Sequence, residues 1–555
     1  MGHPEDMPSP WAGEGSTHDV VNQVPPLRWR GDRDDPLLQQ WLERAGAGWA
    51  LTGLERHGER LGEELGRAAR WAERCPPVLC SHDPQGHRID VVEYHEGYHR
   101  LLEAGVGMGM TGLPWQHPGH RGRHVVRAAH FYLQHQLDAG SCCPLSMTFS
   151  AVPALRHQPE LAREWEPLLC SRQYDGDNRP WYEKPGATLG MAMTEKQGGT
   201  DVAANATRAR PVAGRGPGRE YRLTGHKWFC SAPMSDGFLV LAQAPGGLSC
   251  LLMPRWQPDG RKNPILIQRL KDKLGNRSNA SAEIELTNSL AWLVGEEGRG
   301  VATIMSMVAL TRADCVTGSA ALMRRALVQA VHHCRHRRVM GRRLLDQPLM
   351  RNVLADLALE SRAALHLAFY LAEQIEQAEE GNAQAERLVR LLTAVAKYWV
   401  CRRTPAMVNE AAECLGGAGY IEEFPMAWLY REAPLNAIWE GCSNVQCLDV
   451  LRALDRDASL LEAVHAELDT VRGASRELDL WIDGLAPPRE EDRELLARHW
   501  TARLALAVQA MLLWRFDDPE IAQGFARTRL GSSLQHTYGT LTDAGLCDLL
   551  LKSVH

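Results

Sequence analysis

The order in which helical and strand patterns follow one another limits the fold of this chain more than any other feature. Apolar residues recur at three- and four-residue spacing from about residue 36 to 185, which predicts helices. Short β-rich runs broken by Gly, Pro and Asp follow to about residue 290, and long amphipathic helices return near Val301. A doubly wound sheet would alternate strands with helices. The order excludes that fold and predicts a mainly α protein with a central antiparallel β-domain.

Changes in this pattern divide the chain into four regions. We expect an N-terminal extended arm and helical domain (1–186), a β-domain (187–292), a helical bundle (293–450) and a C-terminal helical domain (451–555). The first thirty residues or so carry turn formers and little periodicity, which favours an extended arm. A chain of 555 residues is long enough for about three or four domains.

The composition limits which binding partners and which cellular location we expect. The net charge is −6, so no overall basic surplus favours nucleic acid. The 14 cysteines include no CxxC pair, and we predict no metal site. The first residues lack a basic segment followed by an apolar one, and no apolar run approaches the ~18 residues of a membrane helix. We therefore expect a cytoplasmic protein.

Two stretches at the head of the β-region suit a flat or phosphorylated ligand. Gly190 to Val202 reads GMAMTEKQGGTDV, in which glycines let backbone N–H groups approach a ligand and threonines add donors. The stretch GHKWFCSA places Trp228 and Phe229 beside Ser231, where aromatic rings can wall a ring system. The first stretch fits an ordinary polar loop equally well, and aromatic residues at a strand start usually belong to the core.

The segment HHCRHRRVMGRR is strongly basic around one glycine. Its arginines are Arg335, Arg337, Arg338, Arg342 and Arg343. A helix end of this kind is most often a solvated basic face. A phosphate site would need one or two of these arginines aimed at the ligand in a forked contact. Both interpretations stay open at this point.

Glu440 is the residue that most directly suggests catalysis. It lies between Trp439 and Gly441 in the stretch IWEGCSN. Removing a proton next to a carbonyl needs a carboxylate within reach and away from bulk water, and burial raises the pKa of such a group toward the working range. We interpret Glu440 as a base held against a flat cofactor. The alternative is that it only caps a helix that begins near Ser443.

Six motifs then occur in a familiar order: MTEKQGGTDV, GHKWFCS, KLGNRS, R-x-x-M-G, CLGGAGY and IWEG. In this order they resemble the acyl-CoA dehydrogenase family over roughly the first 450 residues. The stretches HDVVNQVPPL, AGSCCPLSMTF and LKDKLGNRSNAS are similar to one branch, that of the adaptive-response flavoprotein AidB. The resemblance implies a helical N-domain, a β-barrel or sandwich and a helical bundle, followed by the extra C-terminal helical domain of this branch.

The resemblance also implies FAD as the cofactor. The positions that match its binding residues are Met193, Thr194, Gly199, Thr200, Phe229, Ser231, Arg337, Gln347, Gly416, Gly417, Trp439, Ser443 and Asn444. Thr194 would meet the pyrimidine end of the flavin, and Thr200 its phosphates. Phe229 stands where a tryptophan usually stacks on the ring, and Ser231 replaces a threonine near the reactive nitrogen.

A second part of this set implies an oligomer. Arg337 matches an arginine that reaches the pyrophosphate bound by a neighbouring subunit, and Gly416 and Gly417 match the loop that borders it. The usual glutamine lies one position after Gln347, where this chain has Pro348. The resemblance therefore implies a homotetramer built from dimers.

For catalysis, the resemblance implies an FAD-dependent dehydrogenase that acts on acyl-CoA thioesters. Glu440 matches the catalytic base. Its main-chain N–H and a ribityl hydroxyl of the flavin would polarise the thioester carbonyl. A hydride would pass from the β-carbon of the substrate to the flavin.

The AidB branch adds DNA to the expected partners. It implies binding of double-stranded DNA through the last domain and protection of DNA from alkylation. From Leu451 to His555, however, the chain has 12 Lys+Arg and 17 Asp+Glu, a balance of −5. Two groups of arginines could still contact phosphates: Arg489, Arg493 and Arg498, and Arg515, Arg527 and Arg529. The stretch from Phe525 to Leu541 suits either a patch that binds the DNA backbone or an ordinary helix end followed by a loop.

Three functions remain open. The first is an enzyme that oxidises acyl-CoA thioesters, with either full or weak activity. The second is a flavoprotein that sits on DNA, either as a shield with little or no catalytic activity or by removing the damage. The third is an inactive flavin-bound scaffold, in which the last domain serves subunit assembly.

Overall fold

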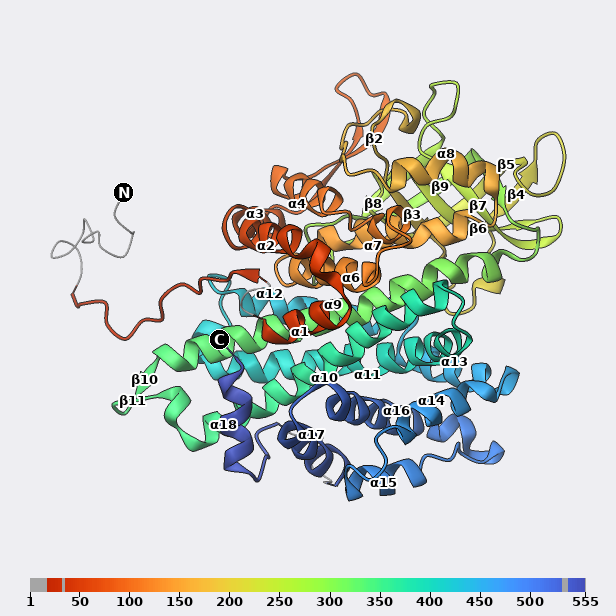
Figure 1. Cartoon of the computed structure of the whole chain (residues 1–555). Helices are drawn as coiled ribbons and strands as arrows, with labels where there is room; N and C mark the ends of the chain where they lie inside the picture. Colours follow the sequence, from red (N-terminus) through yellow and green to blue (C-terminus); the bar gives the residue numbers. More distant parts are fainter. Residues whose placement is uncertain (1–16, 32–34, 532–537, 555) are drawn as a thin grey trace.

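The structure is a computed structural model that describes residues 17–31, 35–531 and 538–554. The first sixteen residues of the expected arm lie outside it, as does part of the stretch from Phe525 to Leu541. Residues 17–30 form no helix or strand, and they run along one end of the molecule (Figure 1).

Helices dominate the N-terminal region, with one exception. They are α1 (Pro36–Arg44), α2 (Leu51–Arg60), α3 (Gly66–Arg74), α4 (Glu96–Gly107), α5 (Leu113–Gln116), α6 (Arg123–His135), α7 (Ala139–Leu155) and α8 (Pro159–Leu169). An antiparallel hairpin, β1 (Val78–His82) and β2 (Arg88–Glu93), interrupts them, although the apolar spacing predicted helices across this region. The Asp83 carboxylate shapes its turn by accepting the main-chain N–H groups of Gln85 and His87.

The β-domain is a barrel. Its strands are β3 (Leu189–Ala192), β4 (Arg208–Pro211), β5 (Glu220–Ser231), β6 (Gly237–Ala244), β7 (Gly247–Pro254), β8 (Ile265–Leu270) and β9 (Ser281–Val294). Strands β6, β4, β5, β9 and β7 pair in that order, and β7 pairs again with β6, so the sheet closes on itself. Most pairings are antiparallel, as expected, but β3 and β4 run parallel to β6.

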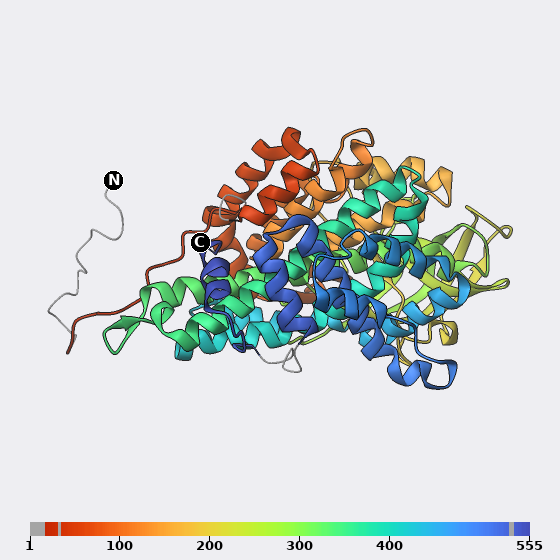
Figure 2. The same cartoon turned by 60° about the horizontal axis from the view of Figure 1, so that its bottom comes forward.

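Long helices cross the middle of the molecule (Figure 1). They are α9 (Gly300–His336), α10 (Pro348–Glu379) and α11 (Ala383–Leu415), followed by α12 (Pro425–Glu432) and α13 (Ser443–Arg456). A small hairpin, β10 (Arg338–Val339) and β11 (Arg342–Arg343), joins α9 to α10. Both views place this hairpin and the barrel at opposite ends of α9 (Figures 1 and 2). Among the described residues, no helix has the length and apolar character needed to cross a bilayer.

The C-terminal region packs along α10 and α11 (Figure 2). Its helices are α14 (Ser459–Asp469), α15 (Arg476–Asp483), α16 (Arg493–Phe516), α17 (Pro519–Phe525) and α18 (Ala544–Lys552). Because α13 runs from 443 to 456, the expected boundary at 450 lies inside a helix. A mainly helical protein with a central β-domain, as predicted, is therefore confirmed.

Buried ion pairs fasten this last region to the bundle. Arg529 pairs with Asp356 and Glu360 of α10, and Glu360 also pairs with Arg403 of α11 at 3.1 Å. All four side chains are less than a tenth exposed. Breaking such a pair leaves an uncompensated buried charge, so this contact orients the C-terminal helices firmly.

Candidate functional site

Glu440 lies in a strained turn between a 3-10 turn at Leu435–Ala437 and α13. Its φ is +56°, a left-handed conformation that is rare for a residue other than glycine, and Gly441 follows at +91°. The main-chain oxygen of Glu440 accepts Nε of Arg312 at 3.0 Å and Nε2 of Gln446 at 3.1 Å. Strain held in place by surrounding contacts is typical of a functional position.

Lys397 fixes the same turn from α11. Its ammonium is almost fully buried and donates to the main-chain oxygens of Asn436, Trp439 and Gly441 at 3.0, 2.8 and 2.9 Å. Sequence reasoning missed this lysine, although a lone cation in the apolar run LLTAVAKYWV was a usable signal. The turn is therefore positioned by a buried cation as well as by α9.

The carboxyl group of Glu440 faces protein rather than bulk water. Burial raises its pKa, while a hydrogen bond from Thr311 and the charges of Lys397 and Arg312 act in the opposite direction. Thr311 Oγ1 donates to Oε2 at 3.0 Å. The residue as a whole is half-buried, and burial is the largest influence on the pKa of its carboxyl. A base near neutral pH needs this balance.

Capping of α13 does not explain Glu440. The N-cap of α13 is Cys442, and no side chain makes a capping hydrogen bond there. The Glu440 carboxyl accepts from Thr311 on α9 instead. The capping alternative therefore has no support in the geometry.

Met193, Thr194, Gly199 and Thr200 lie on the loop that follows β3. Trp228 N donates to the oxygen of Thr194 at 2.8 Å, which ties the loop to β5. A Cβ on Gly199 would come within 2.6 Å of Thr194 Oγ1, so a larger residue there would displace the Thr194 side chain. Gly199 and Thr200 are exposed, and Thr194 is half-buried.

Phe229 and Ser231 lie near the end of β5. Phe229 is 47% exposed, which is high for a large aromatic side chain, whereas Cys230 beside it is fully buried in the barrel. Ser231 is half-buried, and its hydroxyl oxygen lies 3.0 Å from that of Ser281. An exposed ring beside an accessible hydroxyl suits a flat ligand with a polar edge.

One apolar cluster links the loop, the barrel and the Glu440 turn. Met193 and Trp439 both pack against the cluster that contains Ala232, the residue after Ser231. Trp439 also donates Nε1 to Asn436 at 2.9 Å. At the start of α13, Ser443 is buried, and the exposed Asn444 accepts Nε of Arg498 at 2.7 Å. Met193, Ala232 and Trp439 therefore meet at one apolar cluster, and Ser443 and Asn444 follow the Glu440 turn at the start of α13.

The other predicted residues lie at the far end of α9. Twenty-five residues of α9 separate Thr311 from His336, which corresponds to about 38 Å of helix. Arg337 follows directly and donates to the main-chain oxygen of Asn22. The half-buried Gln347 precedes α10.

Gly416 and Gly417 end α11 at the same end of the molecule. Both are exposed, and Gly416 has a φ of +60°. Nothing lies within 4 Å of the Cβ position of either glycine. The fold therefore splits the predicted FAD residues into two separate groups.

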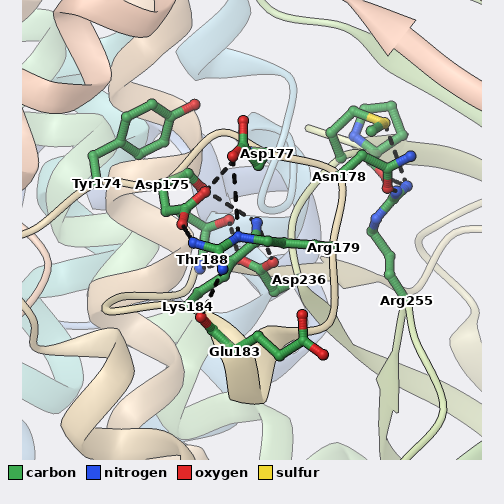
Figure 3. Close-up of polar contacts among 12 residues, drawn as sticks. Tyr174, Asp175, Asp177, Asn178, Arg179, Glu183, Lys184, Thr188, Asp236 and Arg255 are labelled. Carbon is green, nitrogen blue, oxygen red and sulfur yellow. Dashed lines mark hydrogen bonds and ion pairs between the residues drawn. The ribbon is translucent and has the colours of Figure 1, made fainter. Parts of the chain in front are cut away.

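A polar cluster near Ser231 has a structural role (Figure 3). It borders a cavity of about 360 Å³ between α4, α7 and the barrel. Lys184 pairs with Asp236 at 2.8 Å, and Arg179 pairs with Asp175. Asp236 Oδ2 also accepts the N–H of Thr188 at 2.8 Å. Because these charges are paired with one another, the cluster fastens the segment before β3 to the turn after Ser231.

Four of the six arginines predicted as phosphate contacts in the C-terminal region are held by protein partners, whereas Arg489 and Arg527 are exposed. Arg529 is buried against α10, Arg515 pairs with Glu467, and Arg493 pairs with Asp455. Arg498 bonds to Asn444. Within the same described part of the chain, no group of three or more His, Cys, Asp or Glu side chains could hold a metal ion.

Three family models match the chain in order. The description "Adaptive response protein AidB N-terminal domain" matches residues 22–176. The acyl-CoA dehydrogenase middle domain matches 190–289, and the acyl-CoA dehydrogenase C-terminal domain matches 298–454. AidB of Escherichia coli (strain K12) is 41% identical over 545 residues, which are 96% of this chain and 99% of that protein.

Solved structures agree with this match. ACDH-11 of Caenorhabditis elegans, in complex with C11-CoA, superposes with a TM-score of 0.83 at 26% identity, covering 97% of this chain and 93% of that one. An acyl-CoA dehydrogenase from Bacillus anthracis, complexed with FAD, gives a TM-score of 0.60 at 18% identity, with coverage of 83% and 81%. At that identity the second likeness shows the fold alone.

Proposed function

Because the chain belongs to the acyl-CoA dehydrogenase family, we propose that it is an FAD-dependent oxidoreductase that acts on acyl-CoA thioesters. It would remove one hydrogen from the α-carbon and one from the β-carbon. The single observation that carries this proposal is the Glu440 carboxyl, enclosed in a strained turn at the match to the catalytic base. The complex of ACDH-11 with C11-CoA supports an acyl-CoA as the substrate.

The cofactor of the family is FAD, which supplies the hydride acceptor when it is bound. The exposed ring of Phe229, the hydroxyls of Ser231 and Thr194 and the glycine at 199 fit a flat ring with polar edges. In this proposal Trp439 and Met193 border the same space, and Thr200 lies where the phosphates begin.

Glu440 would take the proton from the α-carbon. Thr311 holds Oε2 of the carboxylate, which leaves Oε1 to face the substrate. Burial raises the pKa of Glu440, so the carboxylate is a stronger base than one in water. Lys397 holds the main-chain oxygen of Trp439, which shares a peptide unit with the N–H of Glu440, so this N–H is oriented as a donor for the thioester oxygen.

We further propose that a second copy of the chain completes the cofactor site. Arg337, Gln347, Gly416 and Gly417 lie where α9 ends, about 38 Å of helix from Thr311, which is too far to reach a flavin beside Glu440 of the same chain. Apolar side chains at that end are strongly exposed, with Met340 at 96%, Tyr420 at 90% and Leu349 at 83%. Exposed apolar residues in such number support an interface, and we expect a homotetramer.

Protection of DNA from alkylation is a further proposal that rests on the likeness to AidB. The pairing of Arg493, Arg515 and Arg529 with carboxylates leaves the exposed Arg489 and Arg527 as the predicted phosphate contacts. We therefore expect the full chain to bind duplex DNA weakly, with affinity that falls steeply as salt rises. Binding that does not change with salt would contradict phosphate contacts.

The deciding experiment compares Glu440→Gln with the parent protein. The variant should stay yellow, because the amide keeps the size of the side chain, but bleaching by acyl-CoA should slow by at least about 1,000-fold. Glu423→Gln, which changes an exposed carboxylate, is the matched control. Equal bleaching in all three proteins would remove Glu440 from the mechanism, and a folded parent that cannot take up FAD would refute the assignment.

A further inference from the structure

A chain of hydrogen bonds leads from a lysine to the hydroxyl of Ser231. Ser231, the last residue of β5, pairs in register with Ser281, the first residue of β9, and their hydroxyl oxygens lie 3.0 Å apart. Lys273 approaches from the loop before β9. Its Nζ donates to Ser281 Oγ at 3.2 Å and to the main-chain oxygen of Asn279 at 2.7 Å.

The ammonium group of Lys273 fixes the direction of the first hydrogen bond in this chain. An ammonium group has only donors, so Ser281 Oγ must accept from Lys273. Ser281 then has its own hydrogen free to donate to Ser231 Oγ. When Ser231 accepts that hydrogen, its own hydrogen points away from Ser281. In that orientation Ser231 is a hydrogen-bond donor to a ligand in front of it.

Lys273 lies in an enclosed, charged environment. Burial lowers its pKa to about 8, and Cys143 of α7, Glu432 of α12 and Glu73 of α3 act in the opposite direction. The amine is therefore mostly protonated at neutral pH. Burial also strengthens the hydrogen bond that it gives to Ser281, because little water competes for it.

Ser231 faces the side of β5 that carries the exposed ring of Phe229. Cys230 between them is fully buried in the barrel, so Phe229 and Ser231 point away from the core. A flat ligand stacked at Phe229 would present its edge to the Ser231 hydroxyl.

We propose that Lys273 is a positioning residue for the cofactor. Through Ser281, it holds the hydroxyl of Ser231 as a hydrogen-bond donor toward the reactive nitrogen of the flavin. This inference rests on the proposed function, because it takes Ser231 to face FAD. The competing explanation is that Lys273 only offsets the buried carboxylates of Glu432 and Glu73.

The test is the affinity of the apoprotein for FAD, measured by quenching of flavin fluorescence at pH 7. Lys273→Met removes the start of the chain, and Ser281→Ala removes its middle while leaving the lysine in place. Each should weaken FAD binding by about tenfold, the effect of one hydrogen bond to a charged or polarised group. The double variant should bind no worse than either single variant, because both changes break one path.

Two controls separate positioning from folding. Lys273→Arg keeps a donor and should restore affinity to within about twofold of the parent, and Lys262→Met removes an exposed charge elsewhere in the β-domain and should change nothing. An unchanged Ser281→Ala, or additive losses in the double variant, would overturn the proposal. A lower melting temperature for Lys273→Met with unchanged FAD affinity would assign it a structural role instead. If the parent itself takes up no FAD, the proposed function has failed, which is a different result.

Discussion

The two groups of predicted FAD residues differ in how completely one chain prepares them. Around Glu440, α9, α11 and α13 supply hydrogen bonds to the turn, and the carboxyl itself is held by Thr311. At the far end of α9, Gly416 and Gly417 are exposed and contact nothing at their Cβ positions. Met340 and Leu349, in the connection from α9 to α10 and at the start of α10, are almost fully exposed.

This difference follows from what each group has to do. The pKa of a base depends on desolvation and on fixed donors, so the base must be enclosed by the chain that carries it. A contact to pyrophosphate needs only charge, backbone N–H groups and reach, and another subunit can supply these. The first group should therefore be sensitive to single substitutions, and the second to assembly.

The largest effect is expected from Lys397→Met. It leaves the buried oxygens of Asn436, Trp439 and Gly441 without their donor, and it should lower the free energy of unfolding by at least about 3 kcal/mol. Bleaching by acyl-CoA should be lost with it. Urea unfolding checks the first effect, with the exposed Lys552→Met as control. Equal stability of the two variants would show that the turn does not depend on Lys397.

The group at the far end of α9 is tested by combining two variants in one oligomer. Arg337→Ala should weaken FAD binding by about 30-fold or more, the value of a forked contact to phosphate, while the neighbouring Arg338→Ala should not. Chains that carry Arg337→Ala and chains that carry Glu440→Gln, co-expressed, should recover part of the activity that each lacks alone. Recovery requires that one subunit lends its arginine to another, and no recovery would place Arg337 outside the cofactor site.

A smaller effect is expected from Thr311→Val. The Thr311 hydroxyl stabilises the charged form of Glu440, so its removal should raise the pKa of Glu440 further. The base works deprotonated, and activity should therefore be lost at a higher pH as the solution is acidified. A loss of about tenfold on the acid side is expected. Thr317→Val serves as control, because the Thr317 hydroxyl donates to the main-chain oxygen of Ala313 within the same helix. An equal shift of the pH profile in both variants would contradict the role of Thr311.

The smallest effect concerns pH and Lys273. Its pKa is lowered to about 8 by burial, so the donor-only ammonium is present below that pH and is lost above it. FAD affinity of the parent should be constant below about pH 8 and fall a few-fold above it. In the Ser281→Ala variant, FAD affinity should not change over the same pH range. A parent profile without any change between pH 7 and 9 would show that the charge on Lys273 does not reach the cofactor site.

Much of the fold followed from local patterns. Apolar spacing located the long helices α9, α10 and α11, and runs broken by Gly and Pro located the strands. The hairpin β1–β2 was missed because its turn depends on side-chain contacts of Asp83, which leave no periodic signal. The parallel placement of β3 beside β6 was missed as well, because pairing between strands distant in sequence has no local mark.

The candidate site was only half visible in the sequence. Residues in short motifs, such as Glu440 and Phe229, could be picked out because their chemistry stands out within a few positions. Thr311 and Arg312 could not, since each lies in an ordinary amphipathic helix and matters only through what it contacts. Lys397 left one signal, a lone cation in an apolar run, but its partners could not be read from the sequence.

The amino-acid sequence by itself determined the order of the elements, the family resemblance and the identity of the carboxylate, because these depend on neighbours along the chain. Only the tertiary structure decided what surrounds that carboxylate and that about 38 Å of helix separates it from Arg337. The physical reason is that pKa, hydrogen-bond direction and reach depend on distances in space. Segments far apart in the sequence fix those distances.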